Sequence, residues 1–469
     1  MSATPHGLAA NAAAHTHNRL HVVLTSVIAA LAGLLFGLDI GVISGALPFI
    51  ARQFHVSDQG QEWIVSSMMV GAALGALGSG WMAKAIGRKY SLMIGAALFA
   101  CASGLCAFAP NPEMLIAGRV LLGLAVGIAS FTAPLYLSEI APPNMRGAMI
   151  SLHQLMVTVG ILAAFLSNTA FSGAGDWRWM LGVIAFPALA LLIGLIFLPR
   201  SPRWLMSRGR NEEAAKVLER LRSDSKAVDT EMREIADQLK VEFQGWGLFF
   251  SNPNFRRSVW LGVLLQVMQQ LTGINVVMYY APRIFGLAGY GTAHDQLWGT
   301  VIVGVVNVAA TFIAIGLVDR WGRKPILYTG FTVMALALAS LGGLLHMGVT
   351  SGASQMIAVA MLLLFIAGFA MSAGPMIWIL CAEIQPIKGR DFGIAASTFV
   401  NWVANTIAGA TFLTLLNTLG HAQTFWLYAA MNAAFILLTF WLIPETKGAS
   451  LEKIERNLMA GRALRQLGE

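Results

Sequence analysis

Residues 22–50 have the sequence VVLTSVIAALAGLLFGLDIGVISGALPFI, in which Asp39 is the one ionisable side chain. A helix needs about 20 mostly apolar residues to cross the hydrocarbon core of a bilayer. The run is too long for the core of a signal peptide and lacks a small-residue cleavage site. We therefore expect a membrane-spanning helix that is retained in the mature protein.

Eleven similar runs follow along the 469-residue chain. Only 12% of the residues are charged and 57% are hydrophobic, which excludes an ordinary soluble protein because about 25% of the residues in such a protein are charged. The sequence predicts an all-α polytopic membrane protein. Its twelve spans are expected near 22–50, 62–82, 90–109, 114–138, 148–172, 179–198, 257–285, 296–318, 325–347, 354–382, 392–418 and 424–443.

The basic residues predict how the chain lies in the membrane. All but four of the 31 Lys and Arg residues fall on one side of the predicted spans. Arg52, Arg178 and Arg283 lie on the other side, and Arg119 lies inside a span. Because cytoplasmic segments are enriched in Lys and Arg, both termini are expected in the cytoplasm. The net charge of +8 therefore needs no nucleic-acid partner.

Three motifs of the first half recur in the same order in the second half. Gly87-Arg88-Lys89 returns as Gly322-Arg323-Lys324, Glu139 with Arg146 as Glu383 with Arg390, and Leu198-Pro199-Arg200-Ser201 as Ile443-Pro444-Glu445-Thr446. A duplicated six-span unit is the architecture of many secondary transporters, in which the substrate lies between the halves near mid-membrane. We therefore expect two pseudo-symmetric six-helix bundles.

The chain divides into five expected segments. They are a cytoplasmic tail at 1–21, a bundle at 22–198, a cytoplasmic linker at 199–256, a second bundle at 257–443 and a second cytoplasmic tail at 444–469. Apolar and charged residues in the linker have the spacing of short amphipathic helices. The linker contains no His or Cys and no glycine-rich phosphate loop, so we expect a scaffold there and no enzyme.

Asp39 and Arg119 are charged residues inside predicted spans. Such residues are expensive in a bilayer and usually functional. Asp39 is expected ~16 Å and Arg119 ~9 Å below the outer ends of their helices at 1.5 Å per residue, so that the long arginine side chain can reach the carboxyl. We hypothesise that Asp39 takes and releases a coupling proton and that Arg119 pairs with it in one conformation. The alternative is a static ion pair.

The seventh span has one polar face, formed by Gln266, Gln269, Gln270 and Gly273. Asn275 joins this face only if the helix breaks near Gly273, as helices at transporter binding sites often do. Carboxamides both donate and accept hydrogen bonds, as sugar hydroxyls do, whereas a charged ligand needs compensating charge. The face therefore favours an uncharged polyol. For Gln266, a bond to a neighbouring helix is an equal alternative.

Several motifs together carry a resemblance to a known family. They are Gly-Arg-Lys at 87 and 322, Pro-Leu-Tyr-Leu-Ser-Glu at 134–139, Arg146-Gly147, Ser201-Pro202-Arg203, Gln269-Gln270-Leu-Thr-Gly273-Ile-Asn275 and Pro444-Glu445-Thr446-Lys447. Over essentially its whole length the chain resembles sugar porters of the major facilitator superfamily, and within it the bacterial galactose–proton and arabinose–proton symporters. The resemblance implies that the sugar site contains Gln154, Gln269, Gln270, Asn275, Trp378 and Asn401. It also implies that Tyr279 and Tyr280 gate that site from outside.

Repeated charged residues at the cytoplasmic ends of the spans predict a latch of ion pairs that joins the halves when that side is closed. Its candidate members are Arg88, Glu139, Arg146, Arg203, Arg323, Glu383, Arg390 and Glu445. The alternative is that these side chains anchor helix ends among the headgroups, where isolated pairs contribute little. Arg200 stands where the family motif has Glu, which argues against a symmetric latch.

These observations predict a secondary active transporter that imports a neutral monosaccharide, such as galactose or arabinose, by proton symport with alternating access. Facilitated uniport of the same sugar and export of drugs or organic ions are the alternatives. No cofactor or metal is expected, because the proton is the coupling ion and the spans contain no cluster of metal-binding side chains. We expect a monomer in the inner membrane of a bacterium, with sugar and lipid as its partners.

Overall fold

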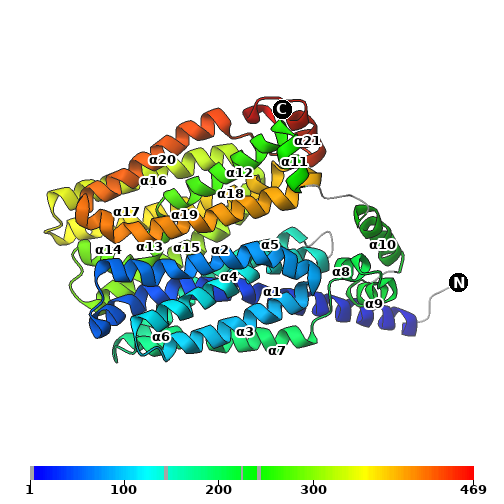
Figure 1. The fold of residues 1–469 in the computed structure, drawn as a ribbon, viewed down its shortest axis with the longest axis horizontal. Coiled ribbons are helices and arrows are strands. Elements are labelled where there is room, and N and C mark those ends of the chain that lie inside the picture. The colour runs from blue at the N-terminus through cyan, green and yellow to red at the C-terminus, as the bar shows by residue number, and fades with distance from the viewer. Residues whose placement is uncertain (1–4, 142–145, 223–224, 240–244) are drawn as a thin grey trace.

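The computed structural model describes residues 5–141, 146–222, 225–239 and 245–469, of which the side chains of 5–25, 29, 146–148, 150, 225 and 319 lie outside the described part. The described residues form 21 α-helices and two short 3-10 helices, with no strand among them. Twelve helical segments are long and apolar enough to cross a membrane. The predicted all-α fold with twelve spans is confirmed. Figure 1 shows two helix bundles side by side.

The first bundle contains the first six spans. They are α1 (Pro5–Phe54), α2 (Asp58–Ala85), α3 (Arg88–Ala107), α4 (Pro112–Ile140), α5 (Arg146–Ser172) and the broken pair α6 (Trp177–Gly182) and α7 (Ala185–Phe197). Local sequence determines where these helices begin. Asn111, for example, accepts a hydrogen bond from the backbone N–H of Met114 and is followed by Pro112, which is a favoured way to start a helix.

The second bundle contains the other six spans, two of which are interrupted. They are α12 (Pro253–Leu271) with α13 (Ile274–Tyr279) and α14 (Ala281–Leu287), α15 (Ala293–Trp321), α16 (Arg323–Met347), α17 (Gly352–Met371) with α18 (Ala373–Glu383), η1 (Ile387–Gly389) with α19 (Arg390–Thr418), and α20 (His421–Leu442). The interruptions follow Leu271 and Met371. Both lie inside predicted spans, where discontinuous helices are a feature of transporter binding sites.

The two bundles have matching internal packing. Helix α1 packs on α5 as α12 packs on α19, and α2 packs on α4 as α15 packs on α17. The bundles meet where α2 contacts α19 and where α5 contacts α15, which are equivalent pairs when the halves are exchanged. Gly87 and Gly322 also share a backbone φ near +90° (91° and 94°) before α3 and α16. The sequence repeat is therefore a structural repeat.

The remaining helices lie at one end of the molecule, which we call the linker end. They are α8 (Pro202–Ser207), α9 (Asn211–Leu221), α10 (Ser225–Leu239), α11 (Gly245–Ser251), α21 (Leu451–Met459) and η2 (Leu464–Gln466). Trp204 of α8 and Arg208 donate hydrogen bonds to the backbone of α2, whereas Trp246 of α11 contacts Phe392 of α19. The predicted linker is thus divided between the two halves. The start of α1 and the C-terminal helix α21 also lie at this end (Figure 1).

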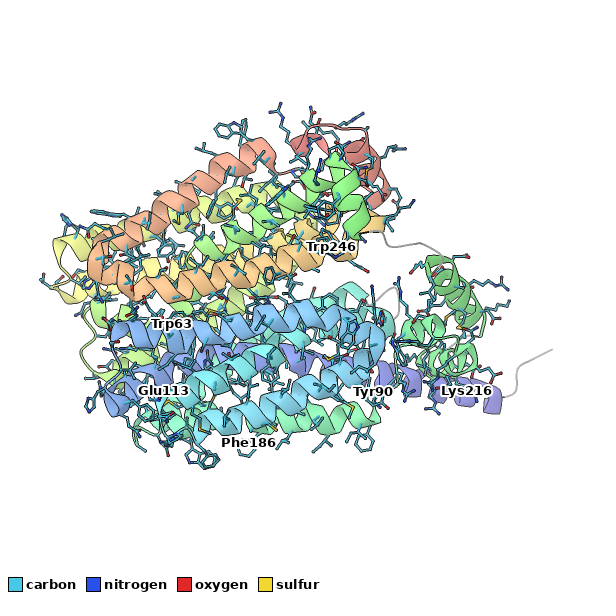
Figure 2. All side chains as sticks on the ribbon, viewed as in Figure 1. Trp63, Tyr90, Glu113, Phe186, Lys216 and Trp246 are labelled. Atoms are coloured by element: carbon cyan, nitrogen blue, oxygen red, sulfur yellow. The ribbon has the colours of Figure 1, made fainter. Side chains whose placement is uncertain are left out.

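Within the first bundle, helices touch through their backbones. A Cβ added to Gly123 of α4 would lie 1.8 Å from the backbone oxygen of Met68 in α2, so no larger residue fits there. Such close contact through small residues is how helices associate in lipid. Large apolar side chains instead face outward, as Phe186 does at 61% exposure on the periphery of the bundle (Figure 2). The first bundle is therefore a tightly packed unit with an apolar outer surface.

Candidate functional site

The charged pair predicted inside the first bundle is present. Arg119 Nη1 of α4 donates to Asp39 Oδ1 of α1 over 2.7 Å, and both side chains have no exposed surface. Arg119 Nε donates to the backbone oxygen of Ile64 in α2 over 3.3 Å. The guanidinium group therefore ties three helices together. Its ion pair also compensates a carboxylate that would otherwise be costly to bury.

One oxygen of the Asp39 carboxyl group has no hydrogen-bond partner among the described residues. Among the described residues, no group donates a hydrogen bond to Asp39 Oδ2, and Arg119 Nη2 has no acceptor. A buried polar atom without a partner is unusual and calls for an explanation. An oxygen that can accept a proton, in a pair that can separate, is one such explanation. The geometry fits the predicted proton site, whose role stays a prediction.

The seventh span breaks at the position that the polar face requires. Helix α12 ends at Leu271, and Gly273 has a left-handed backbone conformation with φ of +94° before α13 begins. Glycine adopts this conformation without steric cost. Because of the break, Asn275 Nδ2 donates to Gln270 Oε1 over 2.6 Å. Asn275 therefore joins the amides of α12, as it would not on a regular helix.

The amides of α12 form a buried network with α19. Asn401 Nδ2 donates to Gln269 Oε1 over 3.0 Å and to Gln266 Oε1 over 2.5 Å. Gln269 Nε2 in turn donates to the backbone oxygens of Ala373 and Gly374, each over 3.1 Å. These two residues begin α18, directly after the interruption of the tenth span. Gln266 thus has the inter-helix bond that was one of its two predicted roles.

Two predicted sugar-site residues lie outside this network. Gln154 is half-buried on α5, in the other bundle. Trp378 on α18 is 40% exposed, although it is only four residues from Gly374 in the same helix. The structure therefore brings together Gln269 with Asn401 and Gln270 with Asn275. The roles of Gln154 and Trp378 in sugar binding stay predictions.

The two tyrosines of the predicted gate are buried on either side of the end of α13. The hydroxyl of Tyr279 accepts a hydrogen bond from Asn405 Nδ2 over 3.2 Å. The hydroxyl of Tyr280 donates to the backbone oxygen of Gly409 over 2.9 Å. Both bonds hold α13 against α19. The short helix α13 is thus bound to α19 of its own bundle. A gating motion of α13 must either move α19 with it or break these two hydrogen bonds.

The charged pair and the amide network approach each other across the interface. Helix α1 contacts α13, which ends at Tyr279. Phe36, which precedes Asp39 by three residues on α1, contacts Trp402 of α19. Trp402 adjoins Asn401 in sequence. The two sets of polar groups therefore belong to one central region of the molecule.

Equivalent charged pairs lie at the linker end of each bundle. Arg88 donates to Glu139 over 2.7 Å in the first bundle, and Arg323 donates to Glu383 over 2.8 Å in the second. Each glutamate also accepts a hydrogen bond from a hydroxyl group in the following repeated motif, that of Ser201 in one bundle and Thr446 in the other. Every one of these contacts stays within its own bundle. Among the described residues these pairs therefore do not join the two halves, and the latch between halves stays a prediction.

The other predicted latch residues differ between the halves. Glu445 caps the start of α16 by accepting from the backbone N–H groups of Arg323 and Lys324 over 3.1 and 3.0 Å. At the equivalent position Arg200 instead donates to the hydroxyl of Tyr90. Arg390 begins α19 with its Nε atom unpartnered among the described groups, Arg203 lies half-buried in α8, and the side chain of Arg146 is outside the described part. The expected asymmetry is present.

An ion pair and hydrogen bonds join the bundles at the end opposite the linker. Asp58 and Glu62, in the first turns of α2, accept hydrogen bonds from Arg283, Thr414 and Asn417 of the second bundle. Sequence reasoning missed this cluster. The one available signal was a pair of acidic residues four positions apart at the start of a span, which looks the same as a headgroup anchor.

A family model described as Sugar (and other) transporter matches residues 25–458. The chain belongs to the sugar transporter family. Among its curated relatives, this sugar transporter is 64% identical over 451 residues to the galactose-proton symporter of Escherichia coli K12, covering 96% of this chain and 97% of the relative. It is 58% identical to the arabinose-proton symporter of the same organism, with 95% of each chain covered.

Solved structures similar to this sugar transporter have the same fold. The proton:xylose symporter XylE bound to 6-bromo-6-deoxy-D-glucose is 30% identical, with a TM-score of 0.79 over 96% of this chain and 99% of that one. The partially occluded inward open form of XylE from E. coli has a TM-score of 0.80 at the same identity, over 92% of this chain and 99% of that one. The predicted architecture of the major facilitator superfamily is confirmed.

Proposed function

We propose that this protein is a secondary active transporter that imports a neutral monosaccharide together with a proton. The single observation that carries the proposal is the buried Asp39–Arg119 pair, one of whose carboxyl oxygens has no partner among the described groups. The names of the relatives, which are symporters of protons with galactose, arabinose or xylose, support it.

The amide network supports an uncharged polyol as the substrate. The Gln269–Asn401 and Gln270–Asn275 pairs offer donors and acceptors, and such groups match hydroxyls, which need both. The described side chains of this network carry no formal charge. A sugar that enters exchanges its hydrogen bonds to water for hydrogen bonds to these amides. In this structure the amides are bonded to one another instead.

Coupling follows from the arrangement of the two halves. The proton-binding carboxyl belongs to the first bundle and the amides to the second, so a change at either alters the interface that they share. A tightly packed bundle moves as a unit, and rocking of one bundle against the other exposes the central region to one side at a time. Proton uptake at Asp39 weakens its ion pair with Arg119, and this change shifts the equilibrium between the two arrangements.

We also propose that the linker end faces the cytoplasm of a bacterium and that the opposite end faces the periplasm. The support is the excess of Lys and Arg at the linker end. Lys216 on α9 and Glu113 at the start of α4 lie at opposite ends of the molecule (Figure 2). In intact cells, a membrane-impermeant maleimide will label a Glu113→Cys variant and spare a Lys216→Cys variant, both with Cys101→Ser. The opposite labelling contradicts this orientation.

The deciding experiment is the uptake of a panel of labelled sugars into energised vesicles, with and without a protonophore. We expect accumulation of at least one monosaccharide, its loss with the protonophore, and alkalinisation of the medium when that sugar is added. Uptake that only equilibrates and ignores the protonophore indicates a uniporter instead. Transport of cationic dyes without any uptake of sugar indicates an exporter of organic ions.

A further inference from the structure

The end of the molecule opposite the linker is held closed by the start of α2. Asp58 accepts from both terminal nitrogens of Arg283 in α14, each over 3.1 Å, and from Asn417 Nδ2 of α19 over 2.8 Å. Glu62, one turn further along α2, accepts from the backbone N–H and the hydroxyl of Thr414 in α19 over 2.7 and 2.8 Å. These five residues, which we call the outer clamp, join the first bundle to two helices of the second.

Glu62 is an unusual member of the outer clamp because it is only 2% exposed. A buried carboxylate is costly unless hydrogen bonds replace its water. Here each carboxyl oxygen has one donor, and one of those donors belongs to the backbone of α19. The two acidic residues are four positions apart and so share one face of α2. That face is therefore built to hold α19 in position, and it makes these bonds only when the halves touch at this end.

A cavity adjoins the outer clamp. It has a volume of about 350 Å³, and Ser44 of α1, Arg283 and both gate tyrosines contribute to its lining. Ligand pockets begin at about 300 Å³, so the space is comparable to a small-molecule site. Arg283 thus takes part in the clamp and in the wall of the cavity. Both gate tyrosines thus already line this cavity on the inner side of the clamp.

We propose that Asp58 and Glu62 are positioning residues that hold the outward side of the transporter closed, and that release of the outer clamp is the step that admits sugar. The charged pairs at the linker end lie within single bundles, so rocking need not break them. The outer clamp, by contrast, breaks in every cycle, and water replaces the protein donors of Glu62. The inference rests on the proposed function for the identity of the sugar and for which side is outward.

The first test measures opening of this end directly, without sugar. A Ser44→Cys reporter in a Cys101→Ser background is labelled in intact cells with a membrane-impermeant maleimide. Glu62→Gln removes a charged acceptor from the closed state, so the labelling rate is expected to rise about ten-fold, the effect of losing one charge-assisted hydrogen bond. Glu113→Gln is the matched control, because Glu113 is an exposed acid at the same end of the same bundle. Its labelling rate is expected to stay unchanged.

The second test traps the clamp instead of weakening it. In the double variant Asp58→Cys/Asn417→Cys, oxidation joins the two cysteines by a disulfide. The rate of sugar uptake is then expected to fall at least about ten-fold, because a covalent bond that holds one end closed stops alternating access. A reductant restores uptake. Undiminished uptake by the bridged variant overturns the proposal, as does an unchanged labelling rate in Glu62→Gln or an equal rise in Glu113→Gln. Absence of sugar uptake by the unmodified chain contradicts the proposed function, while the labelling result still decides the clamp.

Discussion

The ring of Phe36 meets the ring of Trp402 edge to face across the interface between the bundles, with centroids 5.5 Å apart and planes inclined by 62°. Phe36 lies three residues before the proposed proton carrier, and Trp402 adjoins an asparagine of the amide network. Edge-to-face aromatic pairs are worth about 0.5–1.5 kcal/mol beyond their buried area. This contact is therefore a direct physical link between the two halves at the level of the site.

Replacement of Phe36 by alanine is expected to loosen the coupling between proton and sugar. Loss of the ring leaves the two bundles without this contact, so the state of Asp39 has less influence on the second bundle. The steady-state accumulation ratio of sugar should fall, while exchange of labelled for unlabelled sugar continues. The accumulation ratio should fall less in Phe36→Leu, which keeps an apolar side chain. Equal accumulation by Phe36→Ala and the unmodified protein contradicts this role.

Replacement of Asp39 by asparagine is expected to abolish uphill transport. An amide cannot take up the coupling proton, so the sugar concentration inside should only reach that outside. Exchange of labelled sugar across the membrane should persist within about ten-fold of the original rate, because the amide network of the second bundle is untouched. Both quantities are measured in proteoliposomes with an imposed pH gradient. Survival of gradient-driven accumulation rules out Asp39 as the proton carrier.

Removal of Arg119 alone is expected to destabilise the protein, because a buried carboxyl group then loses its partner. Breaking a buried ion pair from one side typically costs about 3–5 kcal/mol. Arg119→Gln should therefore lower the Tm in detergent, and the double variant Arg119→Gln/Asp39→Asn should recover much of the loss. If the double variant is no more stable than Arg119→Gln, the ion pair does not account for the effect.

Asn401 lies at the centre of the amide network, so its replacement by alanine is expected to weaken sugar binding. Two glutamine oxygens, those of Gln266 and Gln269, then lose their donor. The sugar also loses the hydrogen bonds that it makes to the Asn401 amide, worth about 0.5–1.5 kcal/mol each, and this loss predicts a rise of about ten-fold in the KM for the preferred sugar. Asn211→Ala, on an exposed residue of α9, is the control. An unchanged KM in Asn401→Ala removes that residue from the site.

Gly273 allows the seventh span to break, and its replacement by alanine is expected to impair transport. Its φ of +94° is unfavourable for any residue with a Cβ, and that Cβ would lie 3.0 Å from Tyr428. Left-handed strain of this kind costs about 1–2 kcal/mol per residue. We expect a lower rate of uptake and a lower Tm. Gly343→Ala, where an added Cβ meets nothing within 4 Å, should lower neither.

Much of the fold was predictable because it depends on local properties of the chain. Hydropathy located the twelve spans, since each must be apolar over its own length, and the repeated motifs located the two halves. Asp39 and Arg119 could be chosen because a charge in hydrocarbon is costly wherever its partner lies. The break at Gly273 was anticipated conditionally, from a polar face that a regular helix would not complete.

The partners of these residues depend instead on how separate helices are rotated and pressed together. Nothing near Glu62 in sequence indicates that it bonds to Thr414, which lies 352 residues away. Likewise, periodicity placed Gln269 on a polar face, but it did not predict the hydrogen bonds of Gln269 to the start of α18. A side chain finds such partners only after the helices have packed, and a difference of one residue in rotation, about 100°, would face it elsewhere. Composition and spacing therefore specified which groups enter the membrane, and packing specified which groups meet there.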